Sequence, residues 1–192
     1  NLLKTRPVIE FRNGLAEIRK TAWVFDNQFY RFIESNFEKA ISLEKDVLGE
    51  IIFSSASIKT NVVQKDESEN DIRRILNFGH TFGHAVESVL GLSHGESIAI
   101  GMIKALEISI EKTGLSKDVL DAVKKLLVRI GLPVECDYDF RKFFDAMIND
   151  KKRYDSKIKF VLLRDIGKAQ IAEIELDELR RRHDKITGEK TS

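Results

Sequence analysis

The sequence NFGHTFGHAVE (residues 77–87), followed closely by LSHGE (residues 92–96), contains three of the four histidines of this 192-residue chain. His80 and His84 are four residues apart, so they lie on one face if the segment is helical. Imidazole nitrogens are good ligands for borderline divalent metals such as zinc. The spacing by itself is equally compatible with two histidines that are bonded to backbone or carboxylate groups.

The glycines beside these histidines favour a functional interpretation. Gly79 and Gly83 each cost roughly 1 kcal/mol in a helix, and a close approach of the backbone to a ligand or to a neighbouring helix would account for that cost. A metal site with two histidines also needs a third ligand, usually a carboxylate. The local candidates are Glu17, Asp66, Glu87 and Glu96, and spacing does not choose among them.

The rest of the chain has the periodicity of a mainly helical protein. Apolar residues recur at intervals of three and four, which predicts helices at residues 10–25, 27–44, 46–66 with Asp46 as N-cap, 73–90, 96–112, 116–130 with Ser116 as N-cap, and 139–148. Alternation in residues 157–162 and 169–174 predicts one small hairpin that turns at residues 165–167. The tail from Arg180 reads as a frayed helix end. No strand–glycine-rich turn–helix unit is visible, so we expect no dinucleotide-binding fold within this chain.

Composition excludes several classes of protein. Charged residues make up 33% and hydrophobic residues 42%, and the formal net charge is +1, so the sequence indicates neither a nucleic-acid-binding nor a membrane protein. The single cysteine, Cys136, excludes an internal disulfide and fits a reducing compartment, and we expect a cytoplasmic location. The chain begins at Asn1, and we see no basic segment leading into an apolar one that would indicate a signal peptide. We interpret this start as a cut inside a longer protein, the alternative being a trimmed or disordered N-terminus of a small one.

Four motifs, in one order, resemble those of the 3-dehydroquinate synthases and related sugar-phosphate cyclases. They are GLAEIRK (residues 14–20), KTNVVQKDE (residues 59–67), LNFGHTFGHAVE (residues 76–87) and HGESIAIGM (residues 94–102). Lys151, Lys152 and the hairpin also fit, so the resemblance covers nearly the whole chain. Asp71, where the family often has Gly, and Ser97, where Ala is common, depart from the pattern and leave room for a sister cyclase with another substrate.

The resemblance implies a role for particular residues. The metal ligands would be Glu17, His80 and His94, with zinc or cobalt as the metal. Two further sets of residues would act on the substrate. The catalytic residues would be His84, Lys59 and Lys20, and the substrate-binding residues would be Arg73, Asn77, Lys151 and Lys152. His84 would lie beside the metal without binding it, which corrects the interpretation from spacing. Several fixed cations suit a substrate that carries both a carboxylate and a phosphate.

The resemblance also implies an activity for the full-length protein. Residues 1–192 would be the C-terminal helical metal- and substrate-binding domain, and a preceding domain outside this chain would bind NAD. The enzyme would convert 3-deoxy-D-arabino-heptulosonate 7-phosphate to 3-dehydroquinate and phosphate, as part of aromatic amino acid biosynthesis, and would be a homodimer. This chain alone would be inactive. The rival interpretations are a related sugar-phosphate cyclase, a metal-dependent polyol dehydrogenase, which would not require these lysines and Arg73, and a non-catalytic helical interaction module.

Overall fold

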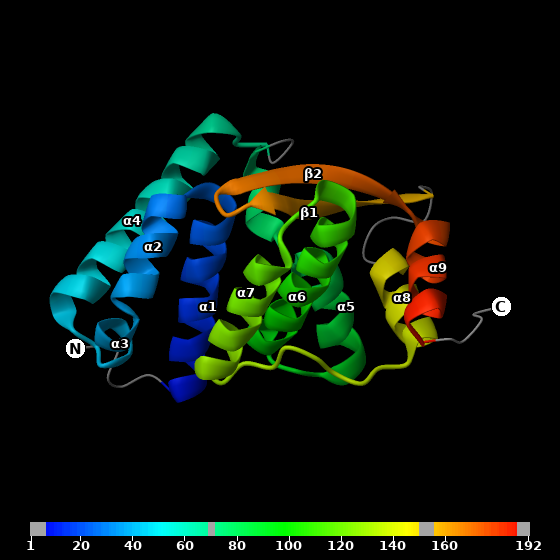
Figure 1. The fold of residues 1–192 in the computed structure, drawn as a ribbon, viewed down its shortest axis with the longest axis horizontal. Helices are drawn as coiled ribbons and strands as arrows, with labels where there is room; N and C mark the ends of the chain where they lie inside the picture. Colours follow the sequence, from blue (N-terminus) through cyan, green and yellow to red (C-terminus); the bar gives the residue numbers. More distant parts are fainter. Residues whose placement is uncertain (1–6, 69–71, 150–155, 188–192) are drawn as a thin grey trace.

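The structure, a computed structural model, describes residues 7–68, 72–149 and 156–187. The secondary-structure elements along the chain, labelled as in Figure 1, are α1 (Val8–Phe25), α2 (Asn27–Ser35), α3 (Phe37–Ile41), α4 (Lys45–Lys65), the 3-10 helix η2 (Ile72–Asn77), α5 (His80–Leu90), α6 (His94–Thr113), α7 (Lys117–Arg129), α8 (Phe140–Asn149), β1 (Lys157–Asp165), β2 (Lys168–Glu175) and α9 (Leu176–Thr187). The prediction of a mainly helical fold with one small hairpin near the C-terminus is confirmed.

Two of the predicted helices are interrupted, and the prediction was wrong at these points. The predicted helix 27–44 divides into α2 and α3 at Asn36, whose φ of −114° and ψ of 19° are not helical. The predicted helix 73–90 divides into η2 and α5 at Gly79, which has a left-handed φ of 81°. Glycine adopts this conformation without the steric cost that a side chain brings, so the glycine marks a break where periodicity indicated a continuous helix.

Several helix ends also differ from the prediction. The helix α4 begins one residue before Asp46, with Glu44 as its N-cap. The helix α6 begins at His94 with Ser93 as N-cap, because Ser93 and Glu96 form a capping box that satisfies two backbone N–H groups. The predicted cap at Ser116 is confirmed, since its hydroxyl accepts a bond from the N–H of Asp118. The tail from Arg180, expected to be a frayed helix end, is helical as far as Thr187, where α9 and the described residues end.

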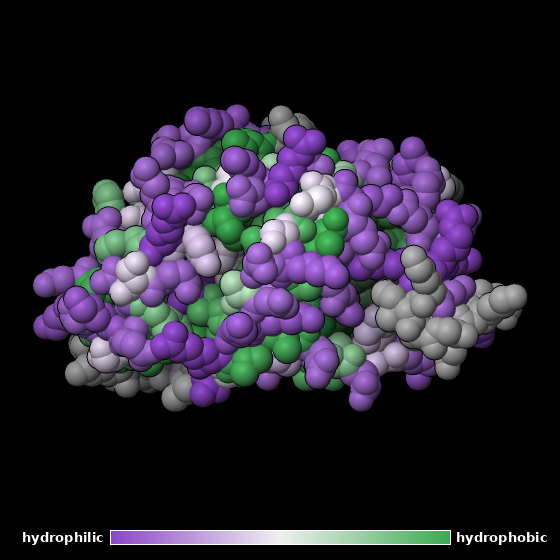
Figure 2. Space-filling model, in the orientation of Figure 1, coloured by the Kyte–Doolittle hydropathy of each residue, from purple (hydrophilic) through white to green (hydrophobic). Residues whose placement is uncertain are grey.

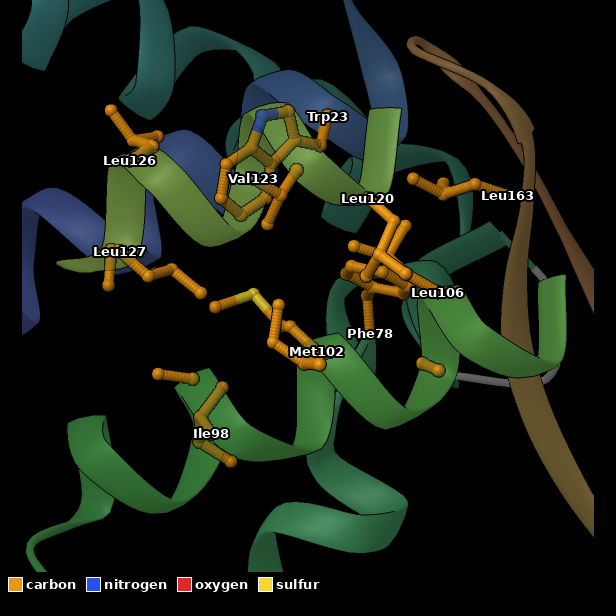
Figure 3. Close-up of a cluster of buried hydrophobic side chains, with 14 of the residues drawn as sticks. Trp23, Phe78, Ile98, Met102, Leu106, Leu120, Val123, Leu126, Leu127 and Leu163 are labelled. Carbon is orange, nitrogen blue, oxygen red and sulfur yellow. The ribbon is translucent and has the colours of Figure 1, made fainter. Parts of the chain in front are cut away.

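The helix α6 is the centre of the main hydrophobic core, as its apolar character predicted. Its buried side chains pack with those of α1, α7 and the segment before α5, and Figure 3 shows Trp23, Met102 and Leu127 among the residues of this cluster. Trp23, Met102 and Leu127 are all fully buried. A buried side chain of this size contributes about 1.5–3 kcal/mol relative to an exposed one, so α6 holds α1 and α7 in fixed positions.

The hairpin lies across one edge of the helices, with β1 and β2 antiparallel (Figure 1). The two faces of β1 serve different clusters: Val161 and Leu163 join the core around α6, whereas Phe160 and Leu162 join a second cluster with α5 and α8. The N–H of Leu163 donates to the hydroxyl of Ser109 on α6 at 3.0 Å. The hairpin therefore ties α5, α6 and α8 into one body.

The surface is polar over most of the face seen in Figure 2, where smaller hydrophobic patches lie between hydrophilic side chains. Among the described residues, no helix has both the length and the apolar character that are needed to cross a membrane.

Candidate metal and substrate site

The helices α5 and α6 approach each other through glycine. A Cβ at Gly101 would lie 2.0 Å from the carbonyl oxygen of Gly79 and 2.6 Å from the backbone nitrogen of Gly83. A Cβ at Gly83 would in turn meet the Cδ1 atom of Ile98 at 2.5 Å. Since real Cβ atoms do not tolerate such distances, only glycine allows this contact between the two backbones. The flanking glycines of the histidine motif are thus explained by a neighbouring helix, and the contact places His80 beside the start of α6.

A second close contact brings α1 to the same place. A Cβ at Gly95, in the first turn of α6, would lie 2.0 Å from the Oδ1 atom of Asn13 on α1. Glu17 is one turn beyond Asn13, so it lies on the same face of α1. The packing of Asn13 on Gly95 therefore turns Glu17 toward His94, the residue that precedes Gly95.

Glu17, His80 and His94 converge in three dimensions. One potential ligand atom from each residue lies within 4.8 Å of the other two, and the ring centroids of His80 and His94 are 5.6 Å apart. A carboxylate oxygen and two imidazole nitrogens are the donor set of many catalytic zinc sites, which keep a further position open for substrate. The residues that the sequence predicted as ligands are thus brought together by α1, α5 and α6.

The other three candidate carboxylates have different partners, and one of them, Glu87, bonds to a converging residue. Asp66 accepts the backbone N–H of Arg73 at 3.0 Å, Glu96 accepts the backbone N–H of Ser93 at 3.0 Å, and Glu87 bonds to the Nδ1 atom of His94 at 3.0 Å. Spacing along the sequence could not have distinguished these roles.

The charges around Glu17 favour its ionised form. Burial by itself would raise the pKa of Glu17, but the nearby charges of Lys20, His80 and Lys59 outweigh it and hold this pKa below its ordinary value. The Nζ atom of Lys20 donates to Glu17 Oε1 at 2.8 Å, and Lys20 is almost completely buried. Burial lowers the pKa of Lys20, the charge of Glu17 opposes this effect, and Lys59 adds to it. The site thus combines a carboxylate with two cations.

The tautomer and the protonation state of His80 suit a metal ligand. Its Nδ1 atom lies 3.3 Å from the carbonyl oxygen of Phe78, and because a carbonyl only accepts, Nδ1 is the nitrogen that carries the proton in this contact. Burial, and then the charge of Lys20, lower the pKa of His80 to about 4. The imidazole is therefore neutral near pH 7 and keeps the Nε2 lone pair available for a metal.

His84 joins the cluster from one turn further along α5. Its ring centroid is 5.3 Å from that of His80 and 6.2 Å from that of His94. Within the described residues it does not belong to the group of three whose ligand atoms converge, and its side chain is exposed. This position agrees with the expectation of a residue beside the metal that is not itself a ligand.

The remaining predicted substrate residues differ in how the structure places them. Arg73 braces the segment before η2, because its Nη1 atom donates to the carbonyl of Glu67 at 2.9 Å. Asn77 is exposed at the end of η2, three residues before His80. Lys151 and Lys152 lie outside the described residues.

Other expectations concerned residues away from the site. Trp23, Phe143 and Phe144 are buried and pack in the hydrophobic clusters. Burial raises the pKa of the Cys136 thiol, which disfavours the reactive thiolate. His183 stacks on the ring of Phe140, with the ring centroids 3.6 Å apart.

Sequence reasoning missed two features of the site. Asn13, which packs on Gly95, lies just outside the first motif. Glu87 was one of several candidate ligands, and its bond to His94 depends on how the chain reverses between α5 and α6. No signal in the sequence distinguished either residue.

Similarity to known proteins identifies the family of this chain. Residues 14–153 match the family described as 3-dehydroquinate synthase C-terminal. The 3-dehydroquinate synthase of Thermoanaerobacter pseudethanolicus is 38% identical over 183 residues, which are 93% of this chain and 51% of that protein. The 3-dehydroquinate synthase of Acetivibrio thermocellus is 41% identical over 167 residues, which are 85% of this chain and 46% of that protein. The chain thus spans about half the length of these curated relatives.

Solved structures share the fold. A 2-epi-5-epi-valiolone synthase from Streptomyces hygroscopicus, with NAD+ and Zn2+ bound, superposes with a TM-score of 0.81 at 23% identity and covers 96% of this chain and 53% of its own. A 2-deoxy-scyllo-inosose synthase in complex with carbaglucose-6-phosphate, NAD+ and Co2+ superposes with a TM-score of 0.76 at 26% identity and covers 93% of this chain and 53% of its own.

Proposed function

This chain belongs to the 3-dehydroquinate synthase family, as its C-terminal part, and from this premise we propose that it is the metal- and substrate-binding domain of such a synthase. The proposed reaction converts 3-deoxy-D-arabino-heptulosonate 7-phosphate to 3-dehydroquinate and phosphate. The observation that supports this proposal most directly is the convergence of Glu17, His80 and His94 within 4.8 Å, next to the cations Lys20 and Lys59.

In this proposal Glu17, His80 and His94 hold one divalent metal, either zinc or cobalt. One carboxylate and two imidazoles suit both metals, and the depressed pKa values of Glu17 and His80 keep both groups in their binding forms near neutral pH. When bound, the metal supplies a Lewis acid that polarises the substrate's oxygen atoms.

The cations of the site bind the anionic groups of the substrate. Lys20 and Lys59 act on the charge of Glu17, so both lie close to the proposed metal position. Charge-assisted hydrogen bonds from fixed cations are the natural partners of carboxylate and phosphate oxygens. Arg73 and Asn77 complete the proposed substrate site from η2, together with Lys151 and Lys152.

His84 is proposed to move protons. Its exposed ring lies beside His80 and His94, with centroids 5.3 Å and 6.2 Å away, so a substrate held by those residues is within its reach. Imidazole exchanges protons near neutral pH, and a positioned general acid or base contributes about 100- to 10,000-fold to a rate.

NAD is proposed to bind a part of the protein outside this chain. Transient oxidation of a ring hydroxyl by the nicotinamide is the chemistry that this cofactor supplies. The chain on its own is therefore expected to show neither turnover nor NAD affinity.

We also propose that the whole protein is a cytoplasmic homodimer. Light scattering of the full-length protein would test the dimeric state.

The choice of substrate is supported by the degree of similarity. The two curated 3-dehydroquinate synthases described above are 38% and 41% identical to this chain, whereas the sister cyclases of known structure are 23% and 26% identical. A sister cyclase activity is the second candidate function. Turnover of the full-length protein with 3-deoxy-D-arabino-heptulosonate 7-phosphate, compared with turnover of the substrates of the sister cyclases, would distinguish the two functions.

Isothermal titration with zinc tests the site in this chain. The parent protein should bind about one zinc ion per chain, and His80→Ala should lose this binding because one of three ligands is absent. His183→Ala is the matched control, since it removes a histidine on α9 that stacks on Phe140 and takes no part in the proposed site. Equal zinc binding by the parent and His80→Ala would refute the ligand assignment.

A further inference from the structure

The hydrogen bond between His94 and Glu87 joins the proposed metal site to a residue that the proposed function does not use. His94 Nδ1 and Glu87 Oε2 are 3.0 Å apart. Glu87 is in the last turns of α5 and His94 is the first residue of α6. The reversal between them depends on Gly91, which ends α5 with a left-handed φ of 65°, a conformation that glycine adopts readily.

This bond determines which nitrogen of His94 keeps a lone pair that can bind a metal. An ionised carboxylate only accepts hydrogen bonds, so Nδ1 of His94 carries a proton and, in the neutral ring, Nε2 carries the lone pair. The orientation of the ring is fixed at the same time. A partner of this kind commonly raises the basicity of a metal-binding histidine and holds its ring in place.

The three converging side chains have different outer partners. His80 donates to the carbonyl of Phe78, and the charge of Glu17 is offset by Lys20 at 2.8 Å. Glu87 is a carboxylate outside this group of three that bonds to one of its members. It adds a negative charge next to a site where a cation with two positive charges would bind.

We propose that Glu87 is a positioning residue that fixes His94 in the tautomer and orientation needed to bind a divalent cation, and that its charge strengthens the binding. This inference rests on the proposed metal site. It does not require Glu87 to touch the metal, because its carboxylate lies at Nδ1, the nitrogen that the ligand role leaves free.

A structural role for the same pair is distinguishable from this one. The His94 side chain is 52% exposed and the Glu87 side chain is 40% exposed, and exposed pairs contribute only about 0–1 kcal/mol to stability. Removal of Glu87 should therefore leave the unfolding midpoint of the metal-free protein nearly unchanged, whereas metal affinity should fall.

Competition of the protein with a chelator for Zn2+ and Co2+ measures this affinity in four variants. We expect Glu87→Ala to weaken binding by roughly 10- to 100-fold. Glu87→Gln keeps an oxygen that accepts from Nδ1 but loses the charge, so its loss should be smaller and still measurable. Asp121→Ala and Asp121→Asn are the matched controls, because they remove one exposed charge from α7 without touching the site, and they should bind like the parent.

The visible spectrum of bound Co2+ gives a second measurement, and a change in protein stability would not by itself alter this spectrum. We expect the d–d bands of the Glu87→Ala complex to shift, because the orientation and basicity of one ligand change. If Glu87→Ala and Glu87→Gln bind both metals as tightly as the Asp121 controls, the inference is overturned while the metal site stands. If the parent and His80→Ala both fail to bind, the proposed function itself fails.

Discussion

The Cα atom of Gly101 on α6 faces the carbonyl oxygen of Gly79, so closely that a Cβ on residue 101 would lie 2.0 Å from that oxygen. The obstacle is backbone, which cannot rotate away as a side chain can. This contact sets the distance between α5, which carries His80, and α6, which begins with His94. The geometry of the proposed metal site therefore depends on a residue that is not one of the proposed ligands.

Gly101→Ala should separate α5 from α6. Overpacking of this kind costs about 1–3 kcal/mol, and the increased distance between the helices should also weaken zinc binding. Urea unfolding measures the first effect and chelator competition the second. Gly49→Ala is the matched control, because a Cβ at this position in α4 meets nothing within 4 Å, and it should raise stability by about 0.5–1 kcal/mol. Parent-like stability and affinity in Gly101→Ala would contradict this explanation.

Gly95→Ala should weaken zinc binding by moving α1, and with it Glu17, away from His94. The new Cβ would lie 2.0 Å from Oδ1 and 2.2 Å from Cγ of Asn13. Asn13→Ala removes both of these atoms, but the Cβ of residue 13 would still lie 2.8 Å from the new Cβ at residue 95. The double variant should therefore recover part of the affinity that Gly95→Ala loses. Isothermal titration of the two single variants and the double variant measures this coupling, and additive losses would argue against a direct clash.

The stability of the metal-free protein should depend on His80 between about pH 4 and 6.5. Burial lowers the pKa of His80 from 6.5 to about 4, so the unfolded chain binds more protons than the folded one in this range. Stability therefore falls as the pH decreases from 6.5 toward 4. His80→Gln does not titrate, and its stability should change less over this interval. Urea unfolding at several pH values tests this difference, and parallel profiles of the parent and the variant would contradict it.

The Arg19–Glu34 pair should respond unequally to the loss of either partner. Arg19 is 1% exposed, and its Nη1 atom donates to Glu34 Oε1 at 2.6 Å. Its Nε and Nη2 atoms are buried and lack hydrogen-bond partners within the described residues. Glu34→Gln leaves the positive charge of Arg19 buried without a full counter-charge, which lowers stability. Arg19→Met removes the buried positive charge itself, so no unpaired charge remains in the interior.

We expect Glu34→Gln to lower stability by about 1–3 kcal/mol and Arg19→Met to lower it less. The Glu34 side chain is 37% exposed, so solvent screens the pair and keeps the loss below that of a fully buried one. The urea midpoints of the two variants measure the difference. A larger loss in Arg19→Met would show that the packing of Arg19 on the ring of Phe37, at 4.5 Å from the ring centroid, outweighs its charge.

Much of the fold and of the ligand set could be predicted from sequence. Apolar periodicity predicted most helices and the hairpin. Apolar side chains that recur on one face of a helix or strand indicate that this face is buried in the core. Helix breaks at Asn36 and Gly79 escaped detection, because the residues around them keep the same periodicity. The proposed ligands Glu17, His80 and His94 were implied by the resemblance of four motifs in one order, and the three residues do converge.

The tertiary structure alone decided what surrounds each of the candidate carboxylates. By spacing alone Glu17, Asp66, Glu87 and Glu96 are equivalent, because each is an acidic side chain within reach of a plausible helix end, and only the resemblance singled out Glu17. They differ only after α1, α5 and α6 pack through glycine, because contacts between residues distant in the chain determine each carboxylate's partner. Local sequence determined where helices form and which chemical groups they carry, whereas the close backbone contacts at Gly95 and Gly101 determined which of those groups meet.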